Sequence, residues 1–435
     1  MTKNYQTKRP RAAILESEIV VPETVNIAMA ELAANVKEGL LALAVGAGLQ
    51  VLEVLIEESV TAVAGPKGRH DPNRVAVRHG TEAGAVTLGG RRVGVRRPRV
   101  RTQDKTAEVA VTAYDLFAST ELLGELALER MMAKLSTRRY HAGLEPVGAA
   151  VEASARSTSR SAVSRRFVAM TERALDELMS ADLSDLDLVA IMIDGVHFAE
   201  HLCVVALGIT IDGTKIPLGL VEGSTENATV VTALLADLAE RGLDVTRPVL
   251  VVIDGAKALA AAVHAVFDRP LIQRCQLHKI RNVEGHLDKA TAATVAKKMR
   301  AAYRDPSPLH AEATLEALAR DLERSHPGAA GSLREGLGET LTVNHLGVPP
   351  TLARTLRSTN AIESMIEICR DHSSNVKRWR DGTMVSRWCA AGMVEAAKQF
   401  RRVNGHLHLG ALRVALDVHF EDVTPACDTH EEEAA

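Results

Sequence analysis

The sequence predicts an α/β protein with a mixed sheet of five strands at its centre and mainly helical regions on either side. Between residues 186 and 285, short apolar strands and amphipathic helices follow the order β-β-β-α-β-α-β. The first three strands are joined by connections that are too short for crossovers, so they form an antiparallel meander. Hydrophobic residues make up 46% of the chain and aromatic residues only 3%, so Ala, Val and Leu must fill the cores.

The N-terminal region, residues 1–75, is predicted to be helical. Apolar residues recur at helical spacing from 23 to 64, and Gly46 and Gly48 are expected to break the run. Residues 65–74 then form a polar loop. The longest uncharged stretch in this region has only fourteen residues. Because a bilayer needs about 20 apolar residues, this stretch indicates a buried helix and no membrane partner.

Residues 76–118 are predicted to form a basic β-hairpin. Apolar residues alternate on both sides of Gly89-Gly90, which is a hairpin turn signal. From Lys67 to Lys105 there are eleven Lys and Arg against three Asp and Glu, and one face of the hairpin is expected to carry the arginines. Basic residues also protect solvated edge strands, but this excess favours contact with phosphates. The predicted DNA contacts here are Arg91, Arg92, Arg96, Arg97, Arg99 and Arg101.

Residues 119–182 are predicted to hold a helix-turn-helix. The segments 136–148 and 159–179 have the pattern of two helices with a linker, and Ser159 or Ser161 could cap the second. A helix whose first turns carry Ser and Arg can reach base edges in the major groove, although many surface helices also carry arginine. The predicted DNA contacts in this region are Arg138, Arg139, Arg160, Ser164, Arg165 and Arg166.

The last third of the chain is predicted to be helical. Residues 286–355 are charged and are punctuated by prolines, and residues 356–418 hold further helices. The tail, residues 419–435, ends in DTHEEEAA and is expected to be disordered.

Three carboxylates stand at positions that suit a metal site. Asp194 and Asp254 each end an apolar strand and precede glycine, and ligands of open α/β sheets gather beyond strand ends. Glu363 follows a Ser-Thr-Asn cluster that caps a helix, so it is expected to face the strand tips. Mg²⁺ takes oxygen ligands, and two ions can activate an attacking oxygen and stabilise a leaving one on phosphorus.

Each carboxylate also has an ordinary structural explanation. Asp-Gly after a strand is a common turn. Glu363 could be the partner of Thr359 or Asn360 in a capping box. The order of the three acidic residues over the β-β-β-α-β-α-β pattern is more specific than any one of them.

Three blocks of the sequence resemble the Mutator-like transposases of bacterial insertion sequences. The resemblance covers most of the chain, from about residue 78 to about residue 402, and its middle block is the most specific. The blocks are IMIDGVHF, VVIDGAKAL with IQRCQLHKIRNV, and RSTNAIESM.

The resemblance implies an RNase H-like catalytic core in residues 186–285 and 356–418, interrupted by an α-helical insertion at 286–355. It implies a DDE transposase that binds terminal inverted repeats as a homodimer or larger assembly. Water would cut at the element ends, and the freed 3′ hydroxyl would attack a phosphodiester of target DNA. The catalytic residues, which would also be the ligands of two Mg²⁺ or Mn²⁺ ions, are Asp194, Asp254 and Glu363.

Cys275 and His278 could form half of a zinc site, but nothing nearby in the sequence completes it. A packed thiol and a histidine that bonds to backbone or DNA is the favoured interpretation. The resemblance implies that both residues support the active site. Further predicted DNA contacts are Lys279, Arg281, Arg378 and Arg380.

The chain departs from the common pattern of the family at several flanking positions. Gly195, Val196 and His197 follow the first aspartate where Ala and an aromatic are common, and Lys257 stands where a histidine is common. The three carboxylates are intact, which indicates a subgroup or a divergent copy. Two other functions stay open: a weakly active or inactive transposase-derived DNA-binding protein, and an RNase H-type nuclease.

A cytoplasmic location is expected from the cysteines and the N-terminal sequence, and the resemblance implies a bacterial protein associated with the nucleoid. Five scattered cysteines without a CxxC pair are typical of a reducing compartment, and the first twenty residues have no signal-peptide pattern. The net charge of −3 gives no nucleic-acid signature for the whole chain, so local charge must provide one. Residues 23–64 are the expected contact between copies, with packing inside one domain as the alternative.

Overall fold

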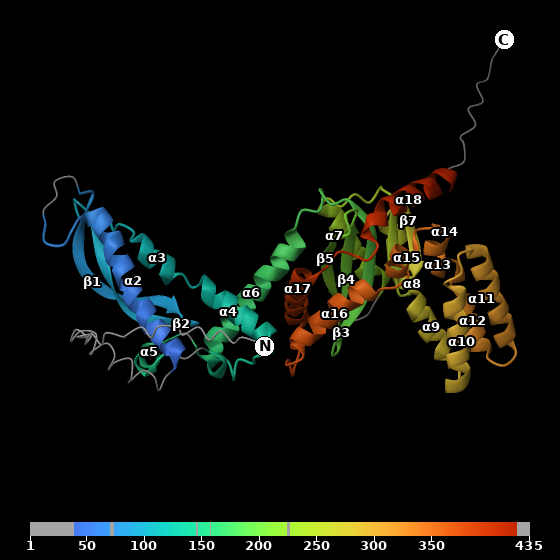
Figure 1. Cartoon of the computed structure of the whole chain (residues 1–435), viewed down its shortest axis with the longest axis horizontal. Helices are drawn as coiled ribbons and strands as arrows, with labels where there is room; N and C mark the ends of the chain where they lie inside the picture. Colours follow the sequence, from blue (N-terminus) through green and yellow to red (C-terminus); the bar gives the residue numbers. More distant parts are fainter. Residues whose placement is uncertain (1–38, 70–73, 145–146, 157, 224–226, 424–435) are drawn as a thin grey trace, which may run out of the picture. The chain divides into compact units, whose positions relative to one another are not determined.

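The computed structural model describes residues 39–69, 74–144, 147–156, 158–223 and 227–423 (Figure 1). These residues fall in two compact units. The first comprises residues up to 123 together with 141–159, and the second comprises 124–140 and the chain from 160 onward. Helix α4 (Glu121–Met132) spans the boundary at residue 123.

The first unit packs one long helix against a two-stranded hairpin. Residues of the helix, such as Val60, share one hydrophobic core with Val86 and Val100 of the two strands. The regions predicted as 1–75 and 76–118 therefore share a core. The elements of this unit are α2 (Leu40–Ala64), β1 (Ala76–Leu88), β2 (Arg91–Thr102), α3 (Thr112–Ala118), η2 (His141–Gly143) and α5 (Ala149–Ser154).

Helix α2 runs without interruption through Gly46 and Gly48, so the predicted break is wrong. A glycine inside a helix costs only about 1 kcal/mol relative to alanine. The burial of Leu52 and Ile56 against the hairpin supplies a larger favourable term. Residues 23–38 of the predicted helix lie outside the described part of the chain.

The hairpin turn is confirmed at Gly89-Gly90, which link β1 to β2. Their φ angles are 55° and 74°, in the left-handed region that only glycine adopts readily. Two successive residues of this kind match the twist of the flanking strands, and this register pairs Leu88 with Arg91.

One of the two helices predicted before residue 182 is confirmed, and the other is wrong. Helix α6 (Arg160–Ser180) matches the second. The described residues of the segment 136–148, which are 136–144 and 147–148, instead hold turns and the single 3-10 turn of η2. It contains Gly143, Pro146 and Gly148, which favour turns over a continuous helix.

The second unit is built on a five-stranded mixed sheet, as predicted. The strand order is β5-β4-β3-β6-β7. The first three strands in sequence pair antiparallel, which confirms the meander, whereas β6 pairs parallel to β3 and β7 parallel to β6. The strands are β3 (Leu188–Phe198), β4 (His201–Thr210), β5 (Lys215–Gly223), β6 (Val249–Ile253) and β7 (Pro270–Arg274).

Helices cover both faces of this sheet. One face packs against α7 and α8, and the other packs against α6 and the helices near the C-terminus (Figure 1). Helix α7 is capped by Asn227, whose side chain accepts a hydrogen bond from Val230 N. Besides α6, the helices around this sheet are α7 (Ala228–Glu240), α8 (Lys257–Val266), α15 (Pro350–Leu356), α16 (Asn360–Ser373), α17 (Gly382–Gln399), η3 (His406–His408) and α18 (Leu409–Val423).

A helical segment between β7 and α15 has a hydrophobic core of its own. Pro308 and Pro327 each stand in the first turn of a helix, where the missing N–H is not needed, so two of the predicted breakers start helices. The helices are α9 (Gln276–Glu284), α10 (Lys289–Ala302), α11 (Pro308–Glu323), α12 (Pro327–Arg334), α13 (Leu337–Thr340) and α14 (Thr342–His345).

Helix α18 extends to Val423, so residues 419–423 are helical and not part of a disordered tail. The helix is held by Leu409, Leu412 and Leu416, which are fully buried at helical spacing. The remainder of the predicted tail lies outside the described residues. Nowhere in the described ranges is a helix both long and apolar enough to cross a membrane.

Gly392→Ala is expected to destabilise the second unit by about 1–3 kcal/mol, the usual range for overpacking. A Cβ at Gly392 of α17 would lie 2.8 Å from the Cα of Cys369 in α16, so one helix would have to move. Urea unfolding followed by tryptophan fluorescence measures this, because Trp379 and Trp388 are the chain's two tryptophans and both belong to this unit.

Gly331→Ala is the matched control for that substitution. Gly331 lies in α12, and a Cβ there meets no atom within 4 Å. This variant should be neutral or gain up to about 1 kcal/mol from helix propensity. Equal unfolding midpoints for the two variants would contradict the close packing of α16 on α17.

Candidate functional site

Strands β3 and β6 place two aspartates side by side on one face of the sheet. The parallel register pairs Met192 with Val252. Continued two residues beyond the last of these pairs, the register brings Asp194 beside Asp254, in agreement with the effect of the Asp254 charge on the pKa of Asp194. Alternate residues of a strand share a face, and both Met192 and Val252 belong to the core under α16. The aspartates therefore face the helix that carries Glu363.

Asp194 does not end its strand, so that part of the prediction is wrong. β3 continues to Phe198 because its outer half stays paired with β4, where Asp194 lies opposite Val205. Only β6 ends at the predicted place, with Asp254 directly after Ile253. Asp194 accepts a hydrogen bond from Gly195 N at 2.8 Å, and Asp254 accepts one from the N–H of the second residue after it at 2.8 Å.

Helix α16 brings the third carboxylate to the same place. Ile362, Met365 and Ile366 are buried against the sheet at helical spacing, which leaves the side chain of Glu363 partly exposed in the first turns. The pKa of Asp194 is raised to about 6. Burial is the largest cause, and the negative charges of Asp254 and Glu363 act in the same direction, while a hydrogen bond from Gly195 N–H and the charge of His278 act against it. The other two predicted carboxylates therefore both act on Asp194 electrostatically.

The hydroxyl of Thr359 connects Glu363 to the Cys-x2-His pair. Its Oγ1 lies 2.6 Å from Glu363 Oε1, 3.4 Å from His278 Nδ1 and 3.4 Å from Cys275 Sγ. A hydroxyl has one hydrogen to donate. The shortest contact assigns that hydrogen to the Glu363 carboxylate, so the oxygen lone pairs face His278 and Cys275. This is no capping box, because the Thr359 side chain makes no cap hydrogen bond with the helix backbone.

The role of Thr359 was missed by the sequence analysis, which treated it only as an N-cap. The signal that could have revealed this role is the spacing of Thr359 and Glu363, because residues four apart at the start of a helix lie on the same side of it. Thr359 is fully buried, whereas Glu363 and His278 keep about a third and a quarter of their side chains exposed. The hydroxyl therefore holds the Glu363 carboxylate from its buried side, through Oε1, and leaves the other carboxylate oxygen accessible.

Cys275, His278 and Glu363 form a group of three possible metal ligands, so the expectation that nothing completes the pair is wrong. One donor atom from each lies within 4.8 Å of the others, and His278 Nε2 is 3.8 Å from Glu363 Oε1. The sequence could not show this, because Glu363 is far away along the chain. Thr359 Oγ1 contacts all three groups, so the arrangement is a hydrogen-bonded network.

The network also shifts the acidity of its members. Burial raises the pKa of Cys275, but hydrogen bonds with His278 and Thr359 outweigh burial, and the net pKa lies below the ordinary value. The hydrogen bond with Cys275 raises the pKa of His278 above its ordinary value against burial, and the charges of Glu363 and Asp194 add to this. His278 is thus biased toward the cationic form beside the carboxylates.

The arginines of β2 do not share one face, so that prediction is wrong. Arg91 and Arg92 are neighbours in one strand, as are Arg96 and Arg97, and successive strand residues point to opposite faces. Arg91 is only 2% exposed and forms an ion pair with Glu152 at 2.9 Å.

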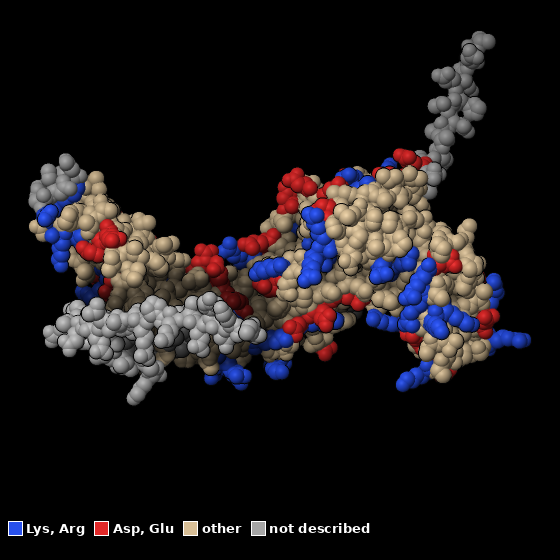
Figure 2. Space-filling view, viewed as in Figure 1, with Lys and Arg blue, Asp and Glu red and all other residues tan. Residues whose placement is uncertain are grey.

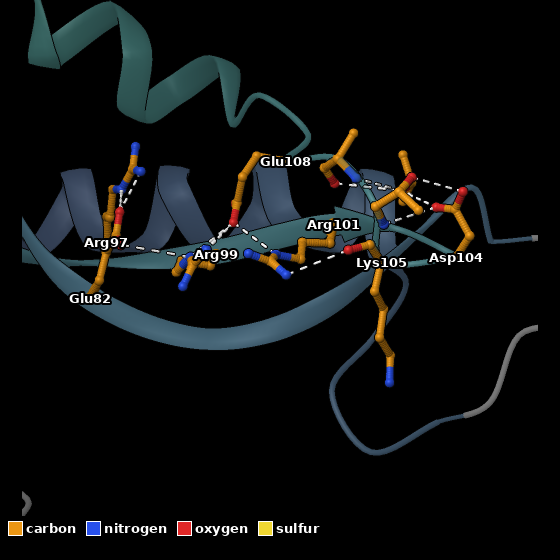
Figure 3. Close-up of polar contacts among 10 residues, drawn as sticks. Glu82, Arg97, Arg99, Arg101, Asp104, Lys105 and Glu108 are labelled. Atoms are coloured by element: carbon orange, nitrogen blue, oxygen red, sulfur yellow. Dashed lines mark hydrogen bonds and ion pairs between the residues drawn. The ribbon is translucent and has the colours of Figure 1, made fainter.

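Other arginines of the hairpin are held by acidic residues of the same unit (Figure 3). Arg97 forms an ion pair with Glu82, and Arg99 and Arg101 both contact Glu108. The hydrogen bond with Arg99 lowers the pKa of Glu108, so the carboxylate stays charged. These ion pairs account for part of the basic excess that was read as a phosphate-binding signal.

The helical candidates for DNA contact differ in accessibility. Arg160, Ser164 and Arg165 are exposed on α6, while Phe167 of the same helix packs on Trp388 with ring centroids 4.6 Å apart. Arg138 and Arg139 lie in the turns that follow α4, and both are exposed.

Lys279 is buried and cannot present its charge at the surface. Its ammonium donates hydrogen bonds to the carbonyls of Ser332 at 2.7 Å and Glu335 at 2.6 Å, at the C-terminal end of α12. Arg281, two residues further along α9, is exposed and lines an open polar groove of about 720 Å³ against α12.

Arg378 and Arg380 are exposed on the loop between α16 and α17. Trp379 between them stacks on Phe198 at the end of β3, with ring centroids 5.0 Å apart. This anchor fixes the loop near the strand that carries Asp194, so its basic residues lie on the same side of the sheet unit as the carboxylates.

Comparison with known sequences places the chain among transposases. A sequence model described as "Transposase, Mutator family" matches residues 23–403. The transposase for insertion sequence element ISRM5 of Rhizobium meliloti (strain 1021) is 27% identical over 364 residues, 83% of this chain and 89% of that relative. The transposase for IS256 in transposon Tn4001 of Staphylococcus aureus is 25% identical over 335 residues, 74% of this chain and 82% of the relative.

A third relative is matched over a shorter stretch. A probable transposase for an insertion sequence element of Corynebacterium diphtheriae is 32% identical over 210 residues. This match spans 48% of the present chain and 60% of the relative.

Asp194→Asn is expected to stabilise the metal-free protein at pH 7.5 by about 1–3 kcal/mol, the free energy of a pKa raised by roughly two units. The raised pKa means that the folded state holds its proton to higher pH than the unfolded state. Ionised Asp194 therefore destabilises the folded state. This destabilisation is complete above about pH 6 and disappears as the pH falls toward 3.8. Tryptophan-detected urea unfolding in EDTA at pH 7.5 and pH 4.5 measures the difference between variant and parent. A gain that is the same at both pH values would sink this explanation.

Proposed function

The chain belongs to the Mutator family of transposases, and on that basis we propose that it cuts and joins DNA strands at the ends of an insertion sequence. The observation that carries the proposal is the meeting of Asp194, Asp254 and Glu363 on one side of the sheet. They come from three separate elements, and the charges of the other two raise the pKa of Asp194. Placing three carboxylates together in a partly buried site costs folding free energy, so packing alone does not explain them.

The sheet supports an RNase H-like core as the frame of this site. Three antiparallel strands are followed by two strands parallel to the first, and the two aspartates come from the two central neighbours β3 and β6. Helix α16 returns to the same sheet after the helical segment with its own core. That segment corresponds to the α-helical insertion implied by the family resemblance.

The donor set fits two Mg²⁺ or Mn²⁺ ions held by Asp194, Asp254 and Glu363. All three offer carboxylate oxygens, the ligands that these hard cations prefer. Each is half-buried, so water can complete the coordination. Bound divalent ions would offset the mutual repulsion of the carboxylates, activate the attacking oxygen and stabilise the leaving oxygen at phosphorus.

The residues of the chain then set up two displacements at phosphorus. In the first, a water oxygen bonds to phosphorus and the bond to the 3′ oxygen breaks, which leaves a free 3′ hydroxyl. In the second, this 3′ oxygen attacks a phosphodiester of target DNA and releases another 3′ hydroxyl. Thr359 orients Glu363 through its 2.6 Å hydrogen bond, and His278, 3.8 Å from Glu363, supplies positive charge beside the scissile phosphate.

The partner in this proposal is double-stranded DNA, both the terminal inverted repeats and the target. Exposed basic residues on α6 and on the loop before α17 are available to phosphates. Two ends must be joined in one event, so we also propose a homodimer or larger assembly. Val51, Val54 and Leu55 are exposed on α2, which supports a contact between copies through this helix.

Glu363→Gln is expected to lower strand transfer by roughly 100-fold or more, the scale for removing one charge-stabilising group from a site. The reaction is followed with purified protein, Mg²⁺, a labelled duplex that carries the element's terminal DNA, and a target plasmid. Glu367→Gln is the matched control, since it removes an exposed carboxylate one turn further along α16 and should keep full activity.

The products separate this proposal from the alternatives. Joined DNA supports a transposase, whereas cut ends that never join indicate a nuclease. DNA binding without any metal-dependent product, at all Mg²⁺ and Mn²⁺ concentrations tried, indicates an inactive DNA-binding protein and overturns the catalytic proposal.

Thr359→Val keeps the shape of the side chain but removes the hydroxyl that holds Glu363. Partners of this kind typically contribute 10–100-fold to metal affinity or activity, so the Mg²⁺ concentration for half-maximal strand transfer should rise by roughly this factor. High Mn²⁺ or Mg²⁺ should restore most of the rate, and Thr359→Ser should behave as the parent. An unchanged metal dependence would exclude a role for Thr359 in positioning the carboxylate.

A further inference from the structure

An arginine-lined cavity of about 750 Å³ opens beside the carboxylate site. Its walls come from the start of α9, the end of α10, the turn before α15 and the residues before α16. Apolar side chains such as Leu277 and Val348 line part of it. Its basic lining residues are Arg300, Arg304, Arg354 and Arg357.

The charge of this cavity is not balanced from within. Asp305 is the one carboxylate in its lining, and Asp305 already accepts hydrogen bonds from Ser307 N at 2.8 Å and pairs with His310 at 2.6 Å. Arg304 and Arg354 form no ion pair with any residue in the described part of the chain. Arg300 is paired with Glu284 at 4.0 Å, outside the lining, which leaves three guanidinium groups against one occupied carboxylate and favours an anionic ligand.

Arg357 is only partly satisfied by the protein. Its Nη1 donates to the carbonyl of Tyr303 at 3.0 Å, but its buried Nε has no hydrogen-bond partner among the residues that the structure describes. Burial lowers the pKa of Arg357 and so disfavours its charge. A buried unpaired donor on a charged group is costly, and an anion in the cavity would relieve that penalty.

The cavity adjoins the residues that hold the candidate active site together. Ser358 and Asn360 line it and stand on either side of Thr359, the residue that holds Glu363. Gln276 also lines it and directly follows Cys275, and Gln276 N donates to Arg357 O at 2.9 Å. The cavity is therefore separated from the Glu363 network only by Thr359 and Cys275, which are fully buried.

We propose that this cavity binds the sugar-phosphate backbone of the DNA strand whose phosphodiester lies at the three carboxylates. The inference rests on the proposed function and specifies where the protein holds the nucleotides next to the reacting phosphodiester. Guanidinium forks match phosphate oxygens in geometry and charge, and the apolar wall suits sugars between phosphates. Figure 2 shows further Lys and Arg side chains gathered over the helical segment α9–α12.

The test compares DNA binding by two double variants at several KCl concentrations. Arg304→Ala/Arg354→Ala removes two exposed, unpaired guanidinium groups from the cavity. Arg269→Ala/Arg324→Ala removes the same charge from exposed positions outside its lining. Both are made in the Glu363→Gln background so that the labelled terminal duplex stays intact, and tryptophan fluorescence checks folding.

Loss of phosphate contacts lowers the slope of log K against log salt by about 0.9 for each contact. The cavity variant should therefore lose about 1–2 from this slope and bind several-fold more weakly, while the control keeps the parental slope. Equal slopes for the two variants would overturn the inference. If both slopes fall equally, the loss reflects general surface charge, which also overturns it.

A free nucleotide is the other source of the same phosphate chemistry. ATP and inorganic pyrophosphate are added as competitors at concentrations far below those that screen DNA. Displacement of DNA by either one at micromolar levels, lost in the cavity variant, would show a nucleotide site and overturn assignment to the DNA backbone. The proposed catalysis is judged separately by Glu363→Gln, so a failure here leaves that result untouched.

Discussion

The parallel pairing of β3 with β6 is the constraint on which the rest of the site depends. Its register sets Asp194 beside Asp254, and strand alternation turns both toward the face that α16 covers. A shift of one residue would send one aspartate to the opposite face, into the core under α7 and α8. Because Met192 and Val252 are fully buried in the core, the hydrophobic effect fixes this register.

Three carboxylates held this close oppose folding, and the surroundings show how the protein limits that penalty. Backbone N–H groups donate to both aspartates, and the Thr359 hydroxyl donates to Glu363. His278 adds positive charge beside them. None of these groups neutralises the whole cluster, so the raised pKa of Asp194 persists in the metal-free protein. Under the proposed function, divalent cations bound at these carboxylates would add to the stability of the folded state.

The helical segment between β7 and α16 is tied to the edge of the sheet by side chains. Gln273 donates to Thr340 O at 2.9 Å and accepts from Val343 N at 2.8 Å, and Thr342 donates to Ile272 O at 2.6 Å. These bonds cover an edge strand that would otherwise be open. They also fix the point at which the chain re-enters the sheet unit, and hence the place of Glu363 and of the arginine-lined cavity.

The sequence by itself determined the elements that local pattern controls: the meander, the Gly89-Gly90 turn, helix α6 and the order of the three carboxylates. Predictions from the sequence were wrong where packing decides the structure. Helix α2 continues through Gly46, and Asp194 lies inside β3 and not at its end. Only the tertiary structure could show the contacts of Thr359 with His278, or the burial of Lys279, because these join residues dozens of positions apart. Local preference is worth about 1 kcal/mol per residue, whereas burial and long-range hydrogen bonds contribute several, so the folded chain decides which side chains meet.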